Sequence, residues 1–215
     1  MNKSIHKYNS KGRLINGWEE GYFSVTTILD VRHKKNLWYW KMAIGQEESS
    51  RIAEEAAQIG TKAHRRLEQL LNGQKFKNTP VDIKKHIDSY YRWADIYQPT
   101  DIKTETFVYS DKYGYAGTAD LICKINGEDW LIDFKTSKNT HPKMGYGIQV
   151  KAYAYAYEEM TGVKCRMGVL QLGMPTKKGW MFRESQESMN LFIAHKIIFD
   201  WQLQHEPIKE PKVKV

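Results

Sequence analysis

The segment Leu131-Ile132-Asp133-Phe134-Lys135-Thr136-Ser137 carries two charged side chains inside an apolar stretch. Because side chains of an extended strand alternate between its two faces, Asp133 and Lys135 point the same way. Ile132 and Phe134 then point into the opposite layer, which predicts a mostly buried strand. An unpaired charge in such a strand is costly, so both charged groups are expected to have a partner or a metal. The alternative is an exposed ion pair on an edge strand.

The sequence just before this segment supplies a second carboxylate. Asn126-Gly127, which favours a two-residue hairpin turn, lies between Asp120 and Asp133. Folding back there would place the two carboxylates on neighbouring strands, close enough to share one divalent cation such as magnesium. A lysine beside the cation, here Lys135, can orient or help to deprotonate an attacking water and can stabilise negative charge on a phosphate. The pattern therefore predicts metal-dependent phosphodiester hydrolysis.

Length and composition predict one globular domain. The chain has 215 residues, of which 41% are hydrophobic and 13% aromatic, enough for a substantial core. Its net charge of +8 favours a polyanionic partner, nucleic acid first and an acidic membrane surface second. Cys123 and Cys165 form no Cys-x-x-Cys pair, which excludes a zinc ribbon or iron–sulfur cluster and favours a reducing compartment. Without a signal-peptide-like start or a bilayer-length apolar run, we expect a cytoplasmic protein with no membrane attachment.

The order of expected elements indicates an α/β (α+β) fold. Residues 1–23 are expected to form a poorly ordered arm or a small hairpin, 24–204 a single domain, and 205–215 a tail. Helices are expected from Ser24 onward and over 46–72, 81–97, 146–160 and 186–204, and strands over 102–110, 115–125, 130–136, 164–173 and 179–184. This order predicts a central mixed sheet flanked by helices, with an N-terminal helical region.

The expected helix over 46–72 has apolar residues at spacings of three and four. These spacings predict one buried stripe, formed by Ile52, Ala56, Ile59, Ala63, Leu67 and Leu70. Gly60 interrupts the helix, which leaves a bend or two abutting helices as alternatives, and Asn72-Gly73 should end it.

Four blocks of sequence occur in an order that is typical of a known family. They are Gly60-Thr61-Lys62-Ala63-His64, Gly117-Thr118-Ala119-Asp120, Ile132-Asp133-Phe134-Lys135-Thr136-Ser137 and Gln149-Val150-Lys151-Ala152-Tyr153. Together they resemble the PD-(D/E)xK nuclease superfamily, in its RecB-like exonuclease branch. Residues 24–29, with Trp40 downstream, also resemble a mitochondrial genome-maintenance exonuclease and small phage-encoded relatives. The resemblance covers about residues 24–204 and implies a restriction-endonuclease-like core.

The resemblance implies a metal site. His64 resembles the histidine that completes the metal shell, together with Asp120, Asp133 and the backbone carbonyl of Phe134. The cation is expected to be Mg²⁺ or Mn²⁺. The alternative for His64 is a surface histidine or one with a purely structural hydrogen bond. Ala119 stands where the superfamily's name has proline, a position that varies within the branch.

The resemblance also implies catalytic residues. Lys135 resembles the catalytic lysine, beside the metal-binding Asp120 and Asp133. Gln149 resembles a glutamine that positions water or the scissile phosphate. Tyr153 lies one helical turn further on and resembles a tyrosine that contacts the DNA backbone.

Two acidic residues have open roles. Glu68 follows His64 by one helical turn, so it either orients the imidazole or pairs with Arg65. Glu105 lies on the strand before Asp120 and resembles a recurring acid of the branch. A second metal site and a hydrogen-bonding scaffold are both open for it.

Basic and aromatic residues near these motifs are candidate DNA contacts. Trp38 and Tyr39 could stack on unpaired bases, the alternative being an amphipathic helix with its lysines in water. Phosphate contacts near the metal are expected from three basic residues beside His64, namely Lys62, Arg65 and Arg66.

We therefore expect a metal-dependent DNA nuclease, most simply an exonuclease acting on the ends of single-stranded DNA in replication, recombination or repair. The alternatives are a structure-specific or nicking endonuclease and a catalytically vestigial DNA-binding accessory. No Gly-x-x-x-x-Gly-Lys-Ser/Thr motif occurs, so ATP hydrolysis is not expected. A helicase, single-strand-binding or recombination partner would be a separate polypeptide. If the chain is phage-encoded, its compartment would be the host cytoplasm.

Overall fold

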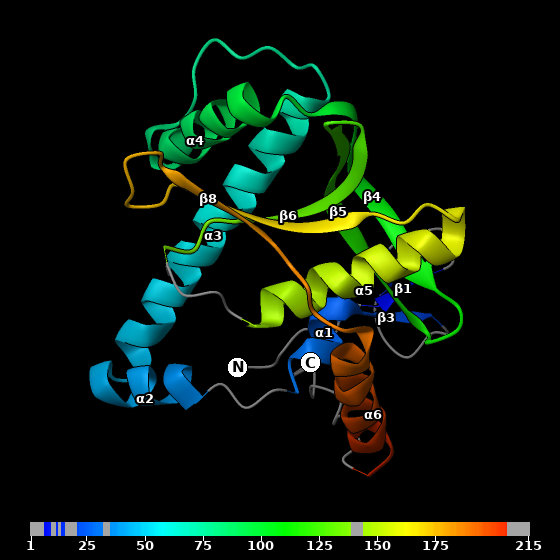
Figure 1. The fold of residues 1–215 in the computed structure, drawn as a ribbon. Helices are drawn as coiled ribbons and strands as arrows, with labels where there is room; N and C mark the ends of the chain where they lie inside the picture. Colours follow the sequence, from blue (N-terminus) through cyan, green and yellow to red (C-terminus); the bar gives the residue numbers. More distant parts are fainter. Residues whose placement is uncertain are drawn as a thin grey trace.

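The structure, a computed structural model, describes residues 7–9, 12, 14–15, 21–31, 35–138 and 144–205. At its centre lies an 8-stranded mixed sheet with helices on both faces (Figure 1). The strands are β1 (Lys7–Tyr8), β2 (Leu14–Ile15), β3 (Tyr22–Ser24), β4 (Thr100–Ser110), β5 (Tyr115–Ile125), β6 (Glu128–Lys135), β7 (Arg166–Leu172) and β8 (Trp180–Glu184). They follow the order β2-β1-β3-β5-β6-β7-β8, and β4 pairs with β5 outside this path. The expected mixed sheet flanked by helices is confirmed and agrees with a restriction-endonuclease-like core.

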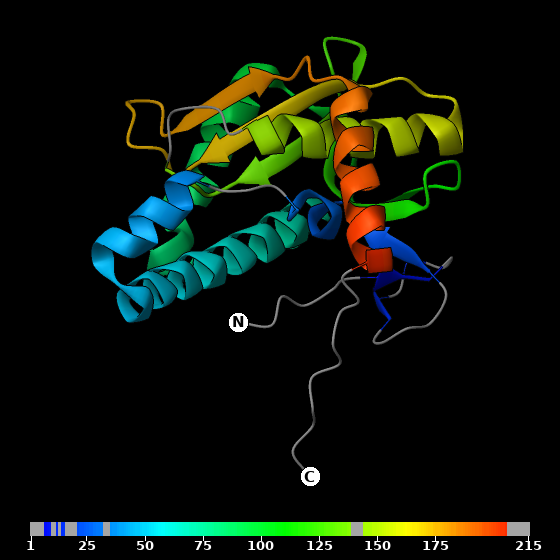
Figure 2. The ribbon, with the colours of Figure 1, turned by 90° about the horizontal axis from the view of Figure 1, so that it is seen from below.

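Two helical layers cover the sheet. Helices α3 (Gln46–Leu71) and α4 (Val81–Tyr97) pack on one face through a core that includes Leu67 and Trp93. Helix α5 (Met144–Thr161) packs on the other face, where α1 (Val25–Leu29) and α6 (Met189–His205) complete the core. Helix α2 (Lys35–Ile44) contacts α3 at the side of the molecule away from α6 (Figures 1 and 2).

The predicted hairpin between the two acidic segments is present. Asn126 and Gly127 have φ angles of 52° and 81°, the left-handed backbone that a tight two-residue turn requires. Strands β5 and β6 pair antiparallel from Ile125↔Glu128 to Leu121↔Ile132. Beyond that pair, Asp133 to Lys135 pair only with β7, in parallel, while the start of β5 pairs with β3. The two strands therefore diverge at the point that carries Asp120 and Asp133.

Helix α3 corrects one expectation and settles another. It runs continuously through Gly60 and ends at Asn72, as predicted, so the bend and the two abutting helices are not present. The prediction of one buried stripe is wrong for its first half, because Ile52 and Ala56 are exposed whereas Ala63 and Leu67 are buried. The reason is tertiary: α2 contacts α3, but the sheet and α4 cover only the second half.

The ends of the chain are described in part. Within the expected arm 1–23, Lys7–Tyr8 and Leu14–Ile15 pair antiparallel, and β3 joins them to the main sheet. Helix α1 begins as predicted, because the Ser24 hydroxyl accepts a hydrogen bond from the Thr27 N–H at 3.1 Å. The predicted tail beyond His205 lies outside the described residues. Among the described helices, none combines the length and the apolar character needed to cross a membrane.

Candidate active site

The divergence of β5 and β6 creates the centre of the site. Beyond the last β5–β6 pair, a side chain replaces the backbone hydrogen bond between the two strands. Asp120 Oδ2 accepts a hydrogen bond from the backbone N–H of Phe134 at 2.6 Å. The backbone donor is thereby satisfied although its strand has left the ladder. Asp120 is thus fixed to the strand that carries Asp133 and Lys135.

Glu105 faces Asp120 from the neighbouring strand. Thr104 pairs with Leu121 and Thr106 with Ala119, so Glu105 stands opposite Asp120 in the β4–β5 register. Its φ is 44°, a left-handed backbone that is rare for a residue with a long side chain. Backbone strain of this kind concentrates at functional sites, where the surrounding structure holds it.

The side chains of β4 do not keep a regular alternation on either side of Glu105. Lys103 donates to the Tyr157 hydroxyl at 3.2 Å, and Ser110 donates to the Glu159 carboxylate at 2.6 Å. Both partners lie on α5, although an odd and an even residue of a regular strand point to opposite faces. Within this irregular stretch the Glu105 carboxylate lies with His64 of α3 and Asp120 of β5.

Helix α3 brings an imidazole to the two carboxylates. His64 Nδ1 lies 3.3 Å from Asp120 Oδ1, and one ligand atom from each of His64, Glu105 and Asp120 lies within 4.8 Å of the others. Two carboxylates and an imidazole are a donor set that a divalent cation accepts. The residues therefore fit a divalent metal site.

The negative charge of this cluster contributes to raised pKa values of Glu105 and His64. Partial burial, followed by the charges of Asp120 and Glu68, raises the pKa of Glu105 to about 7. Burial opposes the charged form of His64, but the hydrogen bond and charge of Asp120 outweigh it and raise the pKa of the imidazole. A bound proton or a bound metal cation would neutralise the same excess of negative charge here.

A second cluster lies on the α5 side of the divergence. Lys135 Nζ lies 2.8 Å from Asp133 Oδ2 and donates to Gln149 Oε1 at 3.1 Å. Gln149 Nε2 in turn donates to the Tyr153 hydroxyl at 3.1 Å. We call these four residues the lysine relay. Gln149 and Tyr153 are one turn apart on α5, which accounts for their meeting.

The lysine relay is buried at Asp133 and Tyr153, whereas Lys135 and Gln149 are half-buried. Asp133 is 2% exposed, and burial, together with the charge of Asp120, raises its pKa to about 6 although Lys135 opposes the shift. Burial opposes the charge of Lys135, but Asp133 and Asp120 outweigh it and raise the lysine pKa, so the ammonium keeps its charge at neutral pH. Tyr153 is 5% exposed, and burial raises the pKa of its hydroxyl well above the ordinary value.

Gly117 makes room for the relay. A Cβ at this position would come within 2.4 Å of Tyr153 Cε1, so the ring packs directly on the strand backbone. The glycine at the start of the Gly117-Thr118-Ala119-Asp120 block therefore has a steric reason, which the sequence alone does not reveal.

The remaining candidate residues fall in different places. Lys62 forms an ion pair with Asp82 of α4 at 3.0 Å, Arg65 is exposed, and the Arg66 guanidinium lies 3.7 Å from the centroid of the Phe76 ring. Trp38 and Tyr39 are 52% and 63% exposed on α2. Their ring centroids are 5.1 Å apart, so the pair forms one aromatic surface.

Two further candidates act on His64, Glu105 and Asp120, which we call the candidate metal-binding cluster. Glu68 acts on Glu105 through its charge. Phe134 contributes its backbone N–H to Asp120, and its carbonyl as a metal ligand stays a prediction. Sequence reasoning left Glu105 between two roles, whereas its carboxylate lies with His64 and Asp120. The sequence predicted no pairing of the strands that carry Glu105 and Asp120, and it is this β4–β5 pairing that sets the two acids opposite each other.

No family model matches the chain, and no curated protein is a significant match. Among solved structures, an alkaline exonuclease from Laribacter hongkongensis is similar with a TM-score of 0.46 and 13% identity, over 85% of this chain and 88% of that one. A candidate exonuclease from Eubacterium rectale gives a TM-score of 0.47 and 11% identity, over 70% of this chain and 69% of that one. Likeness this distant carries no argument about activity, which has to come from the site itself.

Proposed function

We propose that the chain is a divalent-metal-dependent nuclease that hydrolyses phosphodiester bonds in DNA. The observation that carries the proposal is the meeting of two unlike clusters at one strand divergence. His64, Glu105 and Asp120 offer metal-ligating atoms within 4.8 Å of one another, and the charged lysine relay lies beside them. The net charge of +8 supports a polyanionic substrate.

In this proposal the metal binds between helix α3 and strands β4 and β5. His64, Glu105 and Asp120 would hold Mg²⁺ or Mn²⁺, with Asp133 and the Phe134 carbonyl as the further ligands that the sequence resemblance implies. A bound divalent cation supplies charge that polarises a phosphate and lowers the pKa of water. Hydrolysis also needs groups that orient the water and the phosphate, and those come from the chain.

Lys135 has the properties of a charge-stabilising group rather than of a base. Its pKa is raised by Asp133 and Asp120, so the ammonium stays protonated at neutral pH and can donate hydrogen bonds but not accept a proton. Held by Asp133 and Gln149, it cannot turn away from the divergence. We assign it the role of orienting the attacking water and offsetting the negative charge that develops on the phosphate.

Gln149 is held in one amide orientation. Its Oε1 accepts from Lys135 while its Nε2 donates to Tyr153, and a flipped amide would set an NH₂ group against an ammonium. The second N–H of the amide is then available for water or a phosphate oxygen. Tyr153 is almost fully buried, so we assign it to orienting Gln149 in place of the DNA-backbone contact that the sequence resemblance implies.

The preference for single-stranded ends rests on a separate surface. Trp38 and Tyr39 are large, exposed aromatic residues on α2, and such rings stack on unpaired bases without regard to sequence. Together with the resemblance, they favour an exonuclease that acts on single-stranded DNA in replication, recombination or repair. A helicase, single-strand-binding or recombination protein would be its partner there.

The test compares linear with circular single-stranded DNA. End-labelled linear strands and closed circles are incubated with Mg²⁺, Mn²⁺ or chelator, using the wild type, Lys135→Ala and the control Lys164→Ala, which removes an exposed lysine outside the site. We expect metal-dependent loss of the linear strand only, abolished by Lys135→Ala and kept by Lys164→Ala. Cleavage of the circle would replace the exonuclease by an endonuclease. DNA binding without any cleavage would leave a vestigial accessory.

A further inference from the structure

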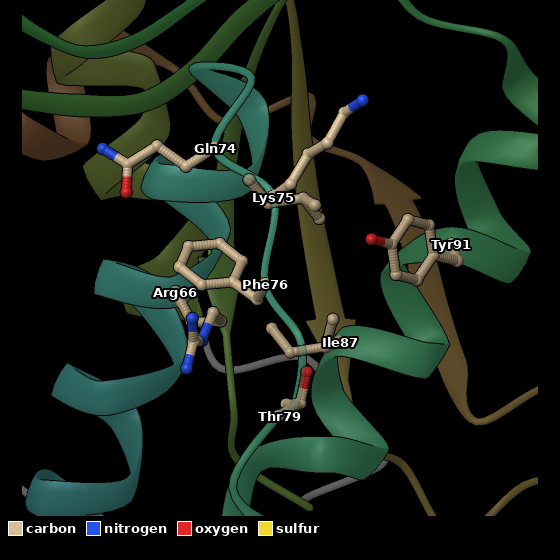
Figure 3. Close-up of a pocket in the computed structure, with 8 residues that line it drawn as sticks. Arg66, Gln74, Lys75, Phe76, Thr79, Ile87 and Tyr91 are labelled. Atoms are coloured by element: carbon tan, nitrogen blue, oxygen red, sulfur yellow. The ribbon is translucent and has the colours of Figure 1, made fainter.

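A pocket lies between α3, the connection 72–80 and α4, outside the site described above (Figure 3). Its volume is about 340 Å³, and it is lined by Arg66, Leu70, Gln74, Lys75, Phe76, Thr79, Ile87 and Tyr91. Successive helix residues are turned by about 100°, so Arg66 and His64 lie on nearly opposite sides of α3. The pocket is therefore separated from the candidate metal-binding cluster by the body of this helix.

The lining of the pocket combines apolar, aromatic and cationic groups. Leu70 and the buried Ile87 provide an apolar floor. Phe76 comes from the connection and Tyr91, which is 48% exposed, from α4; Figure 3 shows the Tyr91 hydroxyl directed toward the space between the two helices. These are the surfaces against which a flat aromatic ligand packs.

The charge of the pocket favours an anion. Arg66 and Lys75 are its ionisable cations, and no carboxylate is among its lining residues. Arg66 is held against the Phe76 ring, 3.7 Å from the centroid, so its position is already restricted before a ligand arrives. Thr79 adds a hydroxyl that could hydrogen-bond to a polar ring edge or a sugar, whereas the Gln74 amide points away from Tyr91 (Figure 3).

We infer that this pocket binds a nucleoside monophosphate unit, with the base between the aromatic side chains and the phosphate near Lys75, while Arg66 stays against the Phe76 ring (Figure 3). The volume lies within the range of small-ligand sites, about 300 to 1,000 Å³. Two sources share this chemistry: a free mononucleotide, or one nucleotide of a bound strand. The second source rests on the proposed nuclease function, whereas the first requires no hydrolysis by this chain.

The test measures binding in chelator, so that no hydrolysis intervenes. Deoxyadenosine monophosphate is titrated by calorimetry into the wild type, Lys75→Ala, Tyr91→Ala and the control Lys164→Ala. Lys75 and Tyr91 are exposed, so both variants should fold, and a thermal melt checks this. We expect at least tenfold weaker binding in both pocket variants and unchanged binding in the control.

Three results would overturn the inference. They are no binding to the wild type, an equal loss in Lys164→Ala, and inorganic phosphate binding as tightly as the nucleotide, which would leave the aromatic walls without a role. A short oligodeoxyadenylate distinguishes the sources: tighter binding than the mononucleotide, weakened by the same variants, assigns the pocket to a strand, and weaker binding assigns it to the free nucleotide. Nucleotide binding by a chain that fails to cleave DNA would refute the proposed function and leave this inference intact.

Discussion

The two clusters of the candidate site differ in how far the protein alone completes them. The lysine relay is buried at Asp133 and Tyr153 and half-buried at Lys135 and Gln149. Lys135, Gln149 and Tyr153 are linked by hydrogen bonds, with Asp133 as the paired anion. The candidate metal-binding cluster of His64, Glu105 and Asp120 is more open, and the charge of Asp120 helps to raise the pKa of both His64 and Glu105. The difference teaches that packing and hydrogen bonds organise the lysine relay, whereas the other cluster offers ligand atoms that a cation would complete under the proposed function.

Removing the lysine ammonium of the lysine relay should have the largest effect. Lys135→Ala should lower the rate of hydrolysis by about 100-fold to 1,000-fold, the loss seen when one transition-state donor is removed. It should also lower the free energy of unfolding by about 3 kcal/mol at pH 8, because Asp133 stays buried without its partner. Single-turnover cleavage and urea unfolding in chelator measure the two effects. An unchanged cleavage rate would remove Lys135 from the mechanism.

Removing a carboxylate ligand from the candidate metal-binding cluster should lower the affinity for metal. Glu105→Gln should weaken Mn²⁺ binding by at least about 10-fold to 100-fold. This is the loss in affinity that follows when a residue hydrogen-bonded to a metal ligand is removed, and the loss of a direct ligand should be no smaller. Gln149→Ala, in the lysine relay, serves as the matched variant and should keep the affinity. The rise in melting temperature with Mn²⁺ concentration reports both. Equal affinity in Glu105→Gln and the wild type would contradict the assignment of Glu105.

The pH dependence of metal binding sharpens the same contrast. The pKa of Glu105 is about 7, above its ordinary value of 4.5, so the metal-free protein loses stability as the pH rises through this range. His64, whose pKa is also raised, must lose its proton before it can ligate. Mn²⁺ should therefore bind more tightly and stabilise the protein more at pH 8 than at pH 6. For each proton that the metal displaces, the affinity should rise by up to about tenfold per pH unit below the pKa of that group and level off above it. Thermal melts at both values, with and without Mn²⁺, provide the measurement; a larger effect at pH 6 would refute this linkage.

The smallest effect is expected from the far end of the relay. Tyr153→Phe removes the hydroxyl that accepts from Gln149 but keeps the ring that packs on Gly117. We expect the activation free energy of cleavage to rise by about 1 kcal/mol, which lowers the rate about fivefold, because the Gln149 amide loses one of the two hydrogen bonds that orient it. Cleavage kinetics test this, with an unchanged melting temperature in Mn²⁺ as the control. A loss as large as that of Lys135→Ala would assign Tyr153 a direct contact with the substrate.

Much of the fold follows from local sequence signals. The hairpin at Asn126-Gly127, the strand ending at Lys135 and the helix carrying Gln149 and Tyr153 all match the prediction within a few residues. These elements depend on turn chemistry and on side-chain period, which act between near neighbours. The stripe of α3 failed where burial required a distant partner, since Ile52 and Ala56 have no sheet beneath them.

The sequence by itself determined which residues share a strand face or a helix turn: Asp133 with Lys135, and Gln149 with Tyr153. Only the tertiary structure decided that Glu105, in a left-handed backbone, lies with His64 and Asp120, and that Asp133 is almost fully buried. Only it brought Arg66 and Tyr91 to the same pocket. Periodicity fixes relations within one element, whereas the divergence of β5 from β6 and the approach of α3 depend on long-range packing that no local pattern encodes.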